Sequence, residues 1–309
     1  MRSVFSPRAL FGYALAAFLF WWFLRRAEWR VLVTGFQSIG WWLLASAILV
    51  RFAALLAASL RWQWLLSPIK RVPLSSLVVA TMMGSAIAAV GSMQAAEVVR
   101  PLVLSRRQGL SFASTFATVT VEWFLDILAV LSLVVPALWL IGRAPVNLTL
   151  ALSFAIAVGG LLFLRFLPMR LARRSSGRFT THIQSFADGL RILERPSGAV
   201  VLALYSLLIA MLIAACCWLA LIAFGLPVSL VSGALLLGLV TIGGMMPTPG
   251  ALGGFHAVCQ WGLVTWFKLD PARAVLPVIG LHAVLYIPPA AVGAFCYFGA
   301  GLSAPRDAE

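Results

Sequence analysis

Charged residues are scarce in this sequence, and acidic residues are scarcer than basic ones. Only 10% of the 309 residues are charged, whereas soluble globular domains carry about 25%. Hydrophobic residues make up 62% of the chain, and the mean hydropathy is +1.01. A chain with so few charges lacks the polar surface of a soluble domain. The composition therefore predicts a polytopic integral membrane protein.

The shortage of acidic residues leaves a formal net charge of +14, from 23 basic and 9 acidic residues. Such a charge also occurs in nucleic-acid-binding proteins, but here most basic residues lie in short connections between apolar runs. These positions suit contact with the anionic head groups of membrane lipids. We therefore expect membrane lipids, and not nucleic acid, as partners.

Cysteine and histidine are too few and too scattered to predict a metal or redox centre. The chain has four cysteines, and no C-x-x-C pair occurs. All four lie in apolar runs, a pattern typical of buried thiols without a ligand. No third ligand accompanies His256 and His282 at metal-binding spacing. We expect neither a metal ion nor a cofactor. The cysteines are Cys216, Cys217, Cys259 and Cys296.

Long apolar runs dominate the remaining sequence. A helix crosses the hydrocarbon core of a bilayer with about 20 apolar residues. The first run lacks a small-residue cleavage site, so we interpret it as a membrane helix that is retained. The sequence predicts an all-α, polytopic transmembrane helix bundle that forms a single integral membrane domain over residues 1–309. The candidate spans are residues 9–24, 38–60, 74–93, 110–141, 146–167, 197–224, 229–246, 251–267 and 274–299.

The distribution of arginine predicts the orientation. Arginines are concentrated in residues 165–195, and short basic loops favour the cytoplasmic side of a membrane. Counting spans from this loop places the N and C termini in the cytoplasm if residues 74–93 do not cross fully. This orientation places three arginines outside the cell, although basic loops favour the cytoplasmic side. They are Arg25, Arg26 and Arg30.

The stretch TIGGMMPTPGALGGFHAVCQ, residues 241–260, interrupts an apolar region. Its turn-forming residues include Pro247, Pro249, Gly250 and Gly253. Broken backbone is tolerated at membrane depth where it is buried in protein or lines a watery cavity. We therefore expect a broken, re-entrant helix hairpin here. The alternative is a plain loop that joins two helices outside the membrane.

A similar break near Gly91 suggests that the chain contains two related halves. Glu97 precedes Glu122 by nearly as many residues as His256 precedes His282. We expect two inverted repeats, about 38–141 and 198–299, each with a broken or re-entrant hairpin and joined by the cytoplasmic loop 165–195. Transporters use such discontinuous helices to present backbone groups to a substrate.

Two carboxylates lie inside one predicted span. Glu122 and Asp126 are four residues apart, so they share a helical face. A charged side chain near the bilayer centre costs roughly 2.5–3.5 kcal/mol or more, so both should face a cavity or an arginine. They are candidates for binding a proton or cation that drives transport. The alternative is a structural salt bridge, with Arg51 as the charge partner.

A second polar group follows the first glycine break. Glu97 and Arg100 share a face if the segment is helical. Together with Arg106 and Arg107 they are candidates for binding a phosphate, because guanidinium groups suit bidentate contact with phosphate oxygens. For the pair Arg106 and Arg107, a basic flank on the cytoplasmic side is the alternative.

Histidine and tryptophan complete the set of polar or aromatic candidates. His256 and His282 are candidates for proton handling, and the alternative is a buried neutral imidazole. Tryptophans cluster near the span ends, where we interpret them as interfacial anchors. These are Trp21, Trp22, Trp41, Trp42, Trp62 and Trp64.

The segments VGSMQAAEVVRPLVLSRRQGL, PTPGALGGFHA and LRWQWLL resemble the flippase-like membrane domain of the lysylphosphatidylglycerol synthase family. The resemblance extends over about residues 38–299. Its first motif is a glycine turn followed by Glu, Arg-Pro and a basic pair, and its second is a Pro-Gly-x-Leu-Gly turn. The matching residues are Glu97, Arg100, Pro101, Arg106 and Arg107, then Pro249, Gly250, Leu252 and Gly253.

The sequence departs from the family pattern at three points. Family members commonly have Gly-Arg before the Glu, where this chain has Gly91, Ser92 and Met93. They usually have Glu after the second turn, where this chain has His256. The aminoacyl-transferring synthase domain is missing from this sequence, so we do not expect this chain alone to synthesise lysylphosphatidylglycerol.

The resemblance implies the translocation or handling of a phospholipid or a polyprenyl-phosphate-linked lipid in the bacterial cytoplasmic (inner) membrane. Two alternatives remain open. An intramembrane lipid-modifying transferase would use Glu122 and Asp126, and a non-transporting subunit would organise a lipid-synthesis complex, as hopanoid-associated relatives do. Partner lipid-synthesis enzymes are expected in the last case. We expect a transporter rather than an enzyme.

Overall fold

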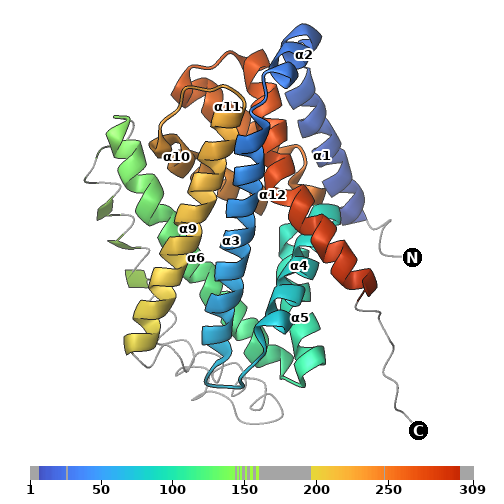
Figure 1. The fold of residues 1–309 in the computed structure, drawn as a ribbon, viewed down its shortest axis with the longest axis vertical. Helices are drawn as coiled ribbons and strands as arrows, with labels where there is room; N and C mark the ends of the chain where they lie inside the picture. The colour runs from blue at the N-terminus through green and yellow to red at the C-terminus, as the bar shows by residue number, and fades with distance from the viewer. Residues whose placement is uncertain are drawn as a thin grey trace.

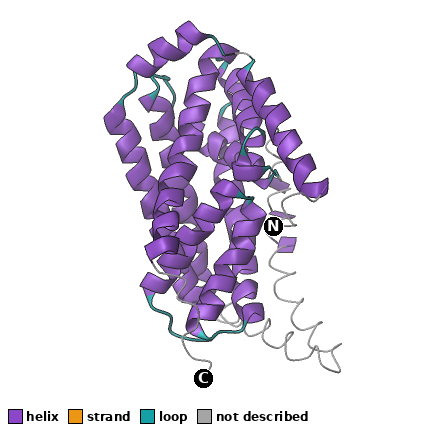
Figure 2. Cartoon of the chain, turned by 90° about the vertical axis from the view of Figure 1, so that its right-hand side faces the viewer, coloured by secondary structure: helices purple, strands orange, loops and turns teal. Residues whose placement is uncertain are grey.

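The computed structural model describes residues 7–25, 27–142, parts of 145–159, 196–246 and 248–299. Within these ranges all regular structure is helical (Figures 1 and 2), which confirms the all-α class. Most of the predicted span 146–167, all of loop 165–195 and Pro247 lie outside the described residues.

Four long helices run through the bundle and are long and apolar enough to cross a membrane. They confirm four of the predicted spans, although α3 ends at Leu66 and the predicted span ended at residue 60, and they make the chain a multi-pass membrane protein. A helix of 26 residues is about 39 Å long, more than the 30 Å of a hydrocarbon core. The four are α3 (Trp41–Leu66), α6 (Phe112–Leu140), α9 (Pro196–Ala223) and α12 (Pro271–Gly299).

Two helical hairpins occupy opposite halves of the bundle. In the first, α4 (Leu74–Val90) runs from the lower end in Figure 1 towards mid-height, and α5 (Met93–Gln108) returns. In the second, α10 (Leu230–Met245) and α11 (Gly254–Phe267) lie in the upper half. A helix of 17 residues is about 26 Å long and falls short of a bilayer core. Broken helices are thus confirmed, whereas an inverted-repeat relation between the halves stays a prediction.

The tips of the two hairpins meet. The short turn η2 (Pro249–Ala251) joins α10 to α11, and the amide of Gly250 donates a hydrogen bond to the carbonyl of Gly91 at 2.7 Å. Beside it, Nε2 of Gln94 donates to the carbonyl of Met245 at 2.8 Å. Each hairpin therefore satisfies backbone groups that the other leaves open at its tip.

Two hydrophobic clusters hold the hairpins in place. The larger cluster joins α9 to α10, α11 and α12 and includes Cys216, Cys217 and Cys259, which confirms the predicted burial of these thiols. The second cluster joins the C-terminal half of α3 to α4, α5 and α6 around Trp62. Cys296 lies outside both clusters and is partly exposed.

The N-terminal segment covers the second hairpin. Helix α1 (Pro7–Leu24) packs against α11 and η2, and a short helix, α2 (Trp29–Gln37), follows at the upper end of the bundle in Figure 1. None of the residues of α2 is buried, and Trp29 and Phe36 are exposed. Tryptophan and phenylalanine at such a place suit the membrane interface.

The hairpin contact makes Gly250 sensitive to substitution. Its φ is +59°, and a Cβ would lie 2.6 Å from the carbonyl oxygen of Ala89. Gly225 is a matched control, because its φ is +73° but a Cβ would meet no atom within 4 Å. We expect Gly225→Ala to cost about 1–2 kcal/mol through its positive φ, and Gly250→Ala to cost at least about 1 kcal/mol more. Thermal unfolding of the purified variants in detergent measures the difference, and equal losses would contradict the proposed importance of the tip contact.

Candidate functional site

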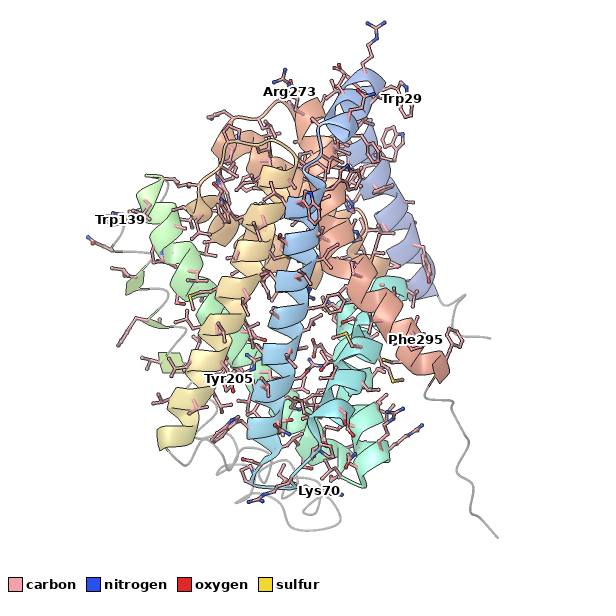
Figure 3. All side chains as sticks on the ribbon, in the orientation of Figure 1. Trp29, Lys70, Trp139, Tyr205, Arg273 and Phe295 are labelled. Atoms are coloured by element: carbon pink, nitrogen blue, oxygen red, sulfur yellow. The ribbon has the colours of Figure 1, made fainter. Side chains whose placement is uncertain are left out.

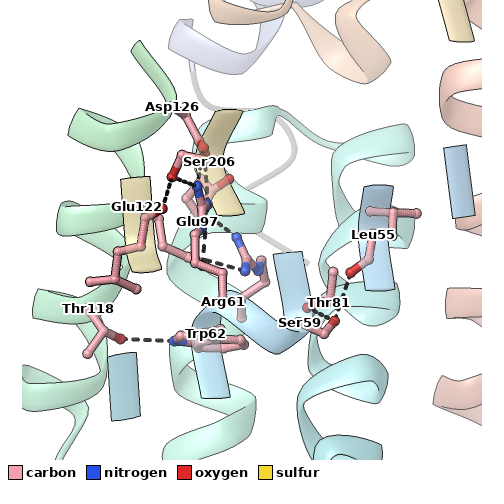
Figure 4. Close-up of polar contacts among 12 residues, drawn as sticks. Leu55, Ser59, Arg61, Trp62, Thr81, Glu97, Thr118, Glu122, Asp126 and Ser206 are labelled. Atoms are coloured by element: carbon pink, nitrogen blue, oxygen red, sulfur yellow. Dashed lines mark hydrogen bonds and ion pairs between the residues drawn. The ribbon is translucent and has the colours of Figure 1, made fainter. Parts of the chain in front are cut away.

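Five ionisable side chains from three helices form one connected chain of ion pairs (Figure 4). Arg61 of α3 makes a two-point contact with Asp126, and its Nη2 lies 3.5 Å from Oε1 of Glu122. Arg100 of α5 binds Oε2 of Glu122 and Oε2 of Glu97, each at 3.1 Å. The order is Glu97, Arg100, Glu122, Arg61, Asp126, and we call this set the ionic chain.

The ionic chain is buried at its centre and most exposed at one end, Asp126. The side chains of Glu122 and Arg61 are 2% and 3% exposed, whereas that of Asp126 is 44% exposed. Glu97 lies between these values at 15%. Three carboxylates share two guanidinium groups. When all five groups are ionised, the set therefore has a net charge of −1.

Helical spacing explains how the ionic chain assembles. The three-residue step from Glu97 to Arg100 and the four-residue step from Glu122 to Asp126 each place two side chains on one face. This confirms that each predicted pair shares a face. Arg61 completes the set from α3.

Neighbouring groups fix the two arginines. The Oγ atom of Ser206 on α9 accepts a hydrogen bond from Nη1 of Arg61 at 2.7 Å. The guanidinium of Arg100 lies over the ring of Trp62, with Cζ 4.8 Å from the ring centroid, and Nε1 of Trp62 donates to Thr118 at 2.9 Å. The ionic chain is thus held by helices α3, α5, α6 and α9.

The charge partners of Glu122 and Asp126 are Arg61 and Arg100, so the prediction of Arg51 is wrong. Arg51 does not pair with the carboxylates; Arg61 and Arg100 do. Arg51 lies about 15 Å from Arg61 along α3, and its Nε donates to the carbonyl of Leu285 on α12 at 3.2 Å. The segment Arg61-Trp62 could have indicated the correct arginine, but the prediction places Trp62 at the membrane interface. It is instead fully buried, whereas Trp42 is 88% exposed.

A cavity of about 580 Å³ lies where the hairpin tips meet and where the ends of the ionic chain are accessible. Its walls are mostly apolar. Trp123 and Met245, both in its lining, are about half exposed, so the cavity opens sideways between α5, α6 and the end of α10. The polar or charged lining residues are Arg51, Gln94, Glu97, Asp126, Thr241 and Tyr286.

The two histidines come together, but they do not join the ionic chain. Their ring centroids are 4.7 Å apart, and Nε2 of His282 hydrogen-bonds to the carbonyl of Gly250 at 2.9 Å. His256 is 2% exposed, and Phe20 and Phe23 of α1 lie against its ring. The histidines therefore support the tip of the second hairpin, and a role in proton handling stays a prediction.

The remaining predicted site residues are dispersed. Pro249 and Gly250 form the tip turn, whereas Gly253 packs against α1. Arg106 and Arg107 are exposed in the last turn of α5, about 14 Å along the helix from Glu97, so they do not share a site with it. Within the described ranges, no group of three Asp, Glu, His or Cys residues could hold a metal ion.

Comparison with known proteins points to one family. The family model of the lysylphosphatidylglycerol synthase TM region matches residues 9–293, which is most of the chain. The match relates the chain to membrane proteins concerned with lipids. A comparison with curated proteins finds no significant match.

The burial of Glu122 makes Arg61 important for stability. We expect Arg61→Met to lower the free energy of unfolding by about 3 kcal/mol, because the buried Glu122 keeps Arg100 but loses Arg61, and Asp126 loses its arginine. The double variant Arg61→Met with Glu122→Gln should recover part of this loss, since one of the surplus negative charges is removed. Thermal unfolding of the purified variants tests both statements. An unchanged unfolding temperature for Arg61→Met would show that the ionic chain does not stabilise the fold.

Proposed function

Because the chain belongs to the lysylphosphatidylglycerol synthase TM family, we propose that it moves the head group of a phospholipid or a polyprenyl-phosphate-linked lipid across the membrane. One observation carries this proposal. A sideways-opening cavity with apolar walls contains charged residues at the level where two broken hairpins meet.

The chemistry of the cavity fits the task of a flippase. A polar head group cannot cross the hydrocarbon core without polar partners, because burying an unpaired charge or hydrogen-bonding group is costly. Glu97, Asp126 and Arg51 offer both signs of charge on the cavity walls. The volume of about 580 Å³ lies within the range of small-molecule sites, about 300–1,000 Å³. The acyl or prenyl chains would remain in the bilayer and leave the cavity through its side opening.

The hairpin tips supply an element that can change its arrangement. Discontinuous helices that meet within a bundle are a common basis for alternating access in transporters. Here the tips are joined by few hydrogen bonds, from Gly250 to Gly91 and from Gln94 to Met245. Separation of the tips would give the cavity access to the opposite side of the membrane.

The same observations favour transport over the two other functions considered. A subunit that only organises a complex needs no cavity between its halves. A transferase would need a free carboxylate as acid or base, whereas Glu122 and Asp126 contact arginines. The accessible charges lie in the cavity, and this arrangement supports binding of a polar group.

We further propose that the lower end of the bundle in Figure 3, marked by Lys70, faces the cytoplasm of a bacterium and that Arg273 faces outward. Arg71 and the exposed Arg106 and Arg107 lie near the same end as Lys70.

In a cysteine-free background, Lys70→Cys should react with an impermeant maleimide only in inverted vesicles. Arg273→Cys should react in intact cells, and its labelling only from the cytoplasmic side would refute this orientation.

Flipping itself is tested in liposomes. With fluorescent phospholipids in both leaflets, dithionite bleaches only the outer leaflet unless lipids exchange. We expect wild-type protein to increase the bleached fraction. Glu97→Gln should slow exchange by roughly tenfold, because a charge-assisted contact in the cavity is lost.

The matched control for Glu97→Gln is Glu28→Gln, which alters an exposed glutamate outside the cavity. It should exchange lipids at the wild-type rate. A polyprenyl-phosphate-linked lipid is the second substrate to test. Wild-type protein that exchanges neither class would contradict the proposed function, and equal rates for Glu97→Gln and wild type would remove Glu97 from the pathway.

A further inference from the structure

Arg51 differs from the other buried arginines in its partners. Arg61 and Arg100 each contact two carboxylates. Across the described part of the chain, no carboxylate oxygen lies within 4 Å of Arg51. Among the described residues, its one hydrogen bond runs from Nε to the carbonyl of Leu285, at 3.2 Å. A carbonyl accepts that bond but does not neutralise the positive charge.

The free end of Arg51 faces the cavity. Among the described residues, the enclosed nitrogen atoms that lack a hydrogen-bond partner include Nε of Arg61 and Nε of Arg100. No nitrogen atom of Arg51 belongs to this set, so the nitrogens of Arg51 that lack a hydrogen bond are not enclosed. Since Arg51 lines the cavity, its terminal nitrogens are accessible from that space. Arg51 lies about 15 Å from the N-terminal end of α3, well inside a helix that crosses the membrane. An unpaired guanidinium at that depth is costly unless an anion occupies the space beside it.

A second donor lies on the same wall. Tyr286 follows Leu285 on α12 and lines the cavity, with its hydroxyl close to Gly244 at the end of α10. No hydrogen bond of that hydroxyl is found among the residues that the structure describes. The guanidinium of Arg51 and the hydroxyl of Tyr286 are therefore both available to an acceptor in the cavity.

The opposite charge lies on other helices. Glu97 on α5 and Asp126 on α6 line the cavity and form the two ends of the ionic chain, in which three carboxylates share two guanidinium groups. An anion in the cavity is attracted to Arg51 and repelled by these carboxylates. The charges thus give the cavity a polarity that favours one orientation of a bound group.

We propose that Arg51, with the hydroxyl of Tyr286, binds the phosphate of a lipid in the cavity. This inference rests on the proposed function and deepens it by naming the chemical group that is recognised. Guanidinium suits phosphate because its planar donors match two phosphate oxygens. The apolar walls and the side opening favour a phosphate that is attached to a lipid over free phosphate.

Displacement of fluorescent phosphatidylglycerol from the purified protein in detergent tests the site. The competitors are unlabelled phosphatidylglycerol, diacylglycerol with the same acyl chains, and soluble glycerol 3-phosphate. Wild-type protein should prefer phosphatidylglycerol to diacylglycerol by roughly tenfold or more. Arg51→Gln should lose this preference, Arg51→Lys should keep part of it, and Tyr286→Phe should reduce it less than Arg51→Gln.

Arg273→Gln is the matched control, because it removes an exposed arginine at the start of α12. It should keep the wild-type preference. An Arg51→Gln variant that folds and still prefers phosphatidylglycerol would overturn the proposal. Displacement by glycerol 3-phosphate as effective as that by phosphatidylglycerol would show a free-phosphate site and overturn the lipid assignment.

Liposome exchange with the same variants separates this inference from the proposed function. If wild-type protein exchanges no lipid but its phosphate preference depends on Arg51, the flippase proposal fails and the phosphate site stands. If wild-type protein exchanges lipid and Arg51→Gln keeps the phosphate preference, the flippase proposal stands and the phosphate site fails.

Discussion

Helices that end inside a membrane protein must find partners for their terminal backbone groups, and the fold depends on how this chain meets that demand. Water is scarce at that depth, so an open amide or carbonyl is costly. The amide of Gly250 and the carbonyl of Gly91 pair across the two hairpin tips, and Gln94 pairs with the carbonyl of Met245. Each hairpin therefore needs the other, and the region where they meet is where polar atoms can gather.

Buried charge follows the same rule. Glu122 and Arg61 are almost fully enclosed, and both have partners of opposite charge. The residues with accessible charge, Glu97, Asp126 and Arg51, all line one cavity. The ion pairs of Glu122 and Arg61 therefore hold helices together. Of the charged residues that line the cavity, Glu97 and Asp126 are paired with arginines, whereas Arg51 has no carboxylate partner among the described residues.

The long spans, the broken hairpins and the family could be predicted from the sequence. Runs such as residues 110–141 exceed the length that a bilayer needs, and α6 occupies Phe112–Leu140. Prolines and glycines marked the break that became η2, because few other residues allow a tight turn in an apolar segment. The motif around Glu97 and Arg100 marked α5, which lies in the site.

The partners of the charges could not be predicted in the same way. Helix α3 is apolar on most of its surface, so its sequence does not show which face turns inward or which arginine reaches α6. The prediction named Arg51, and only the register of α3 against α6 shows that Arg61 is the residue that reaches the carboxylates. Tertiary packing between segments far apart in sequence also determines where the cavity opens. The same holds for the placement of His256 and His282 beside Gly250.

Entry of a lipid head group into the cavity at the hairpin tips is tested most directly by photo-crosslinking. The probe is a phospholipid that carries a diazirine in its head group, and mass spectrometry identifies the modified residues. We expect crosslinks to lining residues such as Met93, Met245 and Tyr286. Crosslinks confined to the outer surface, at exposed residues such as Trp42 and Leu49, would contradict it.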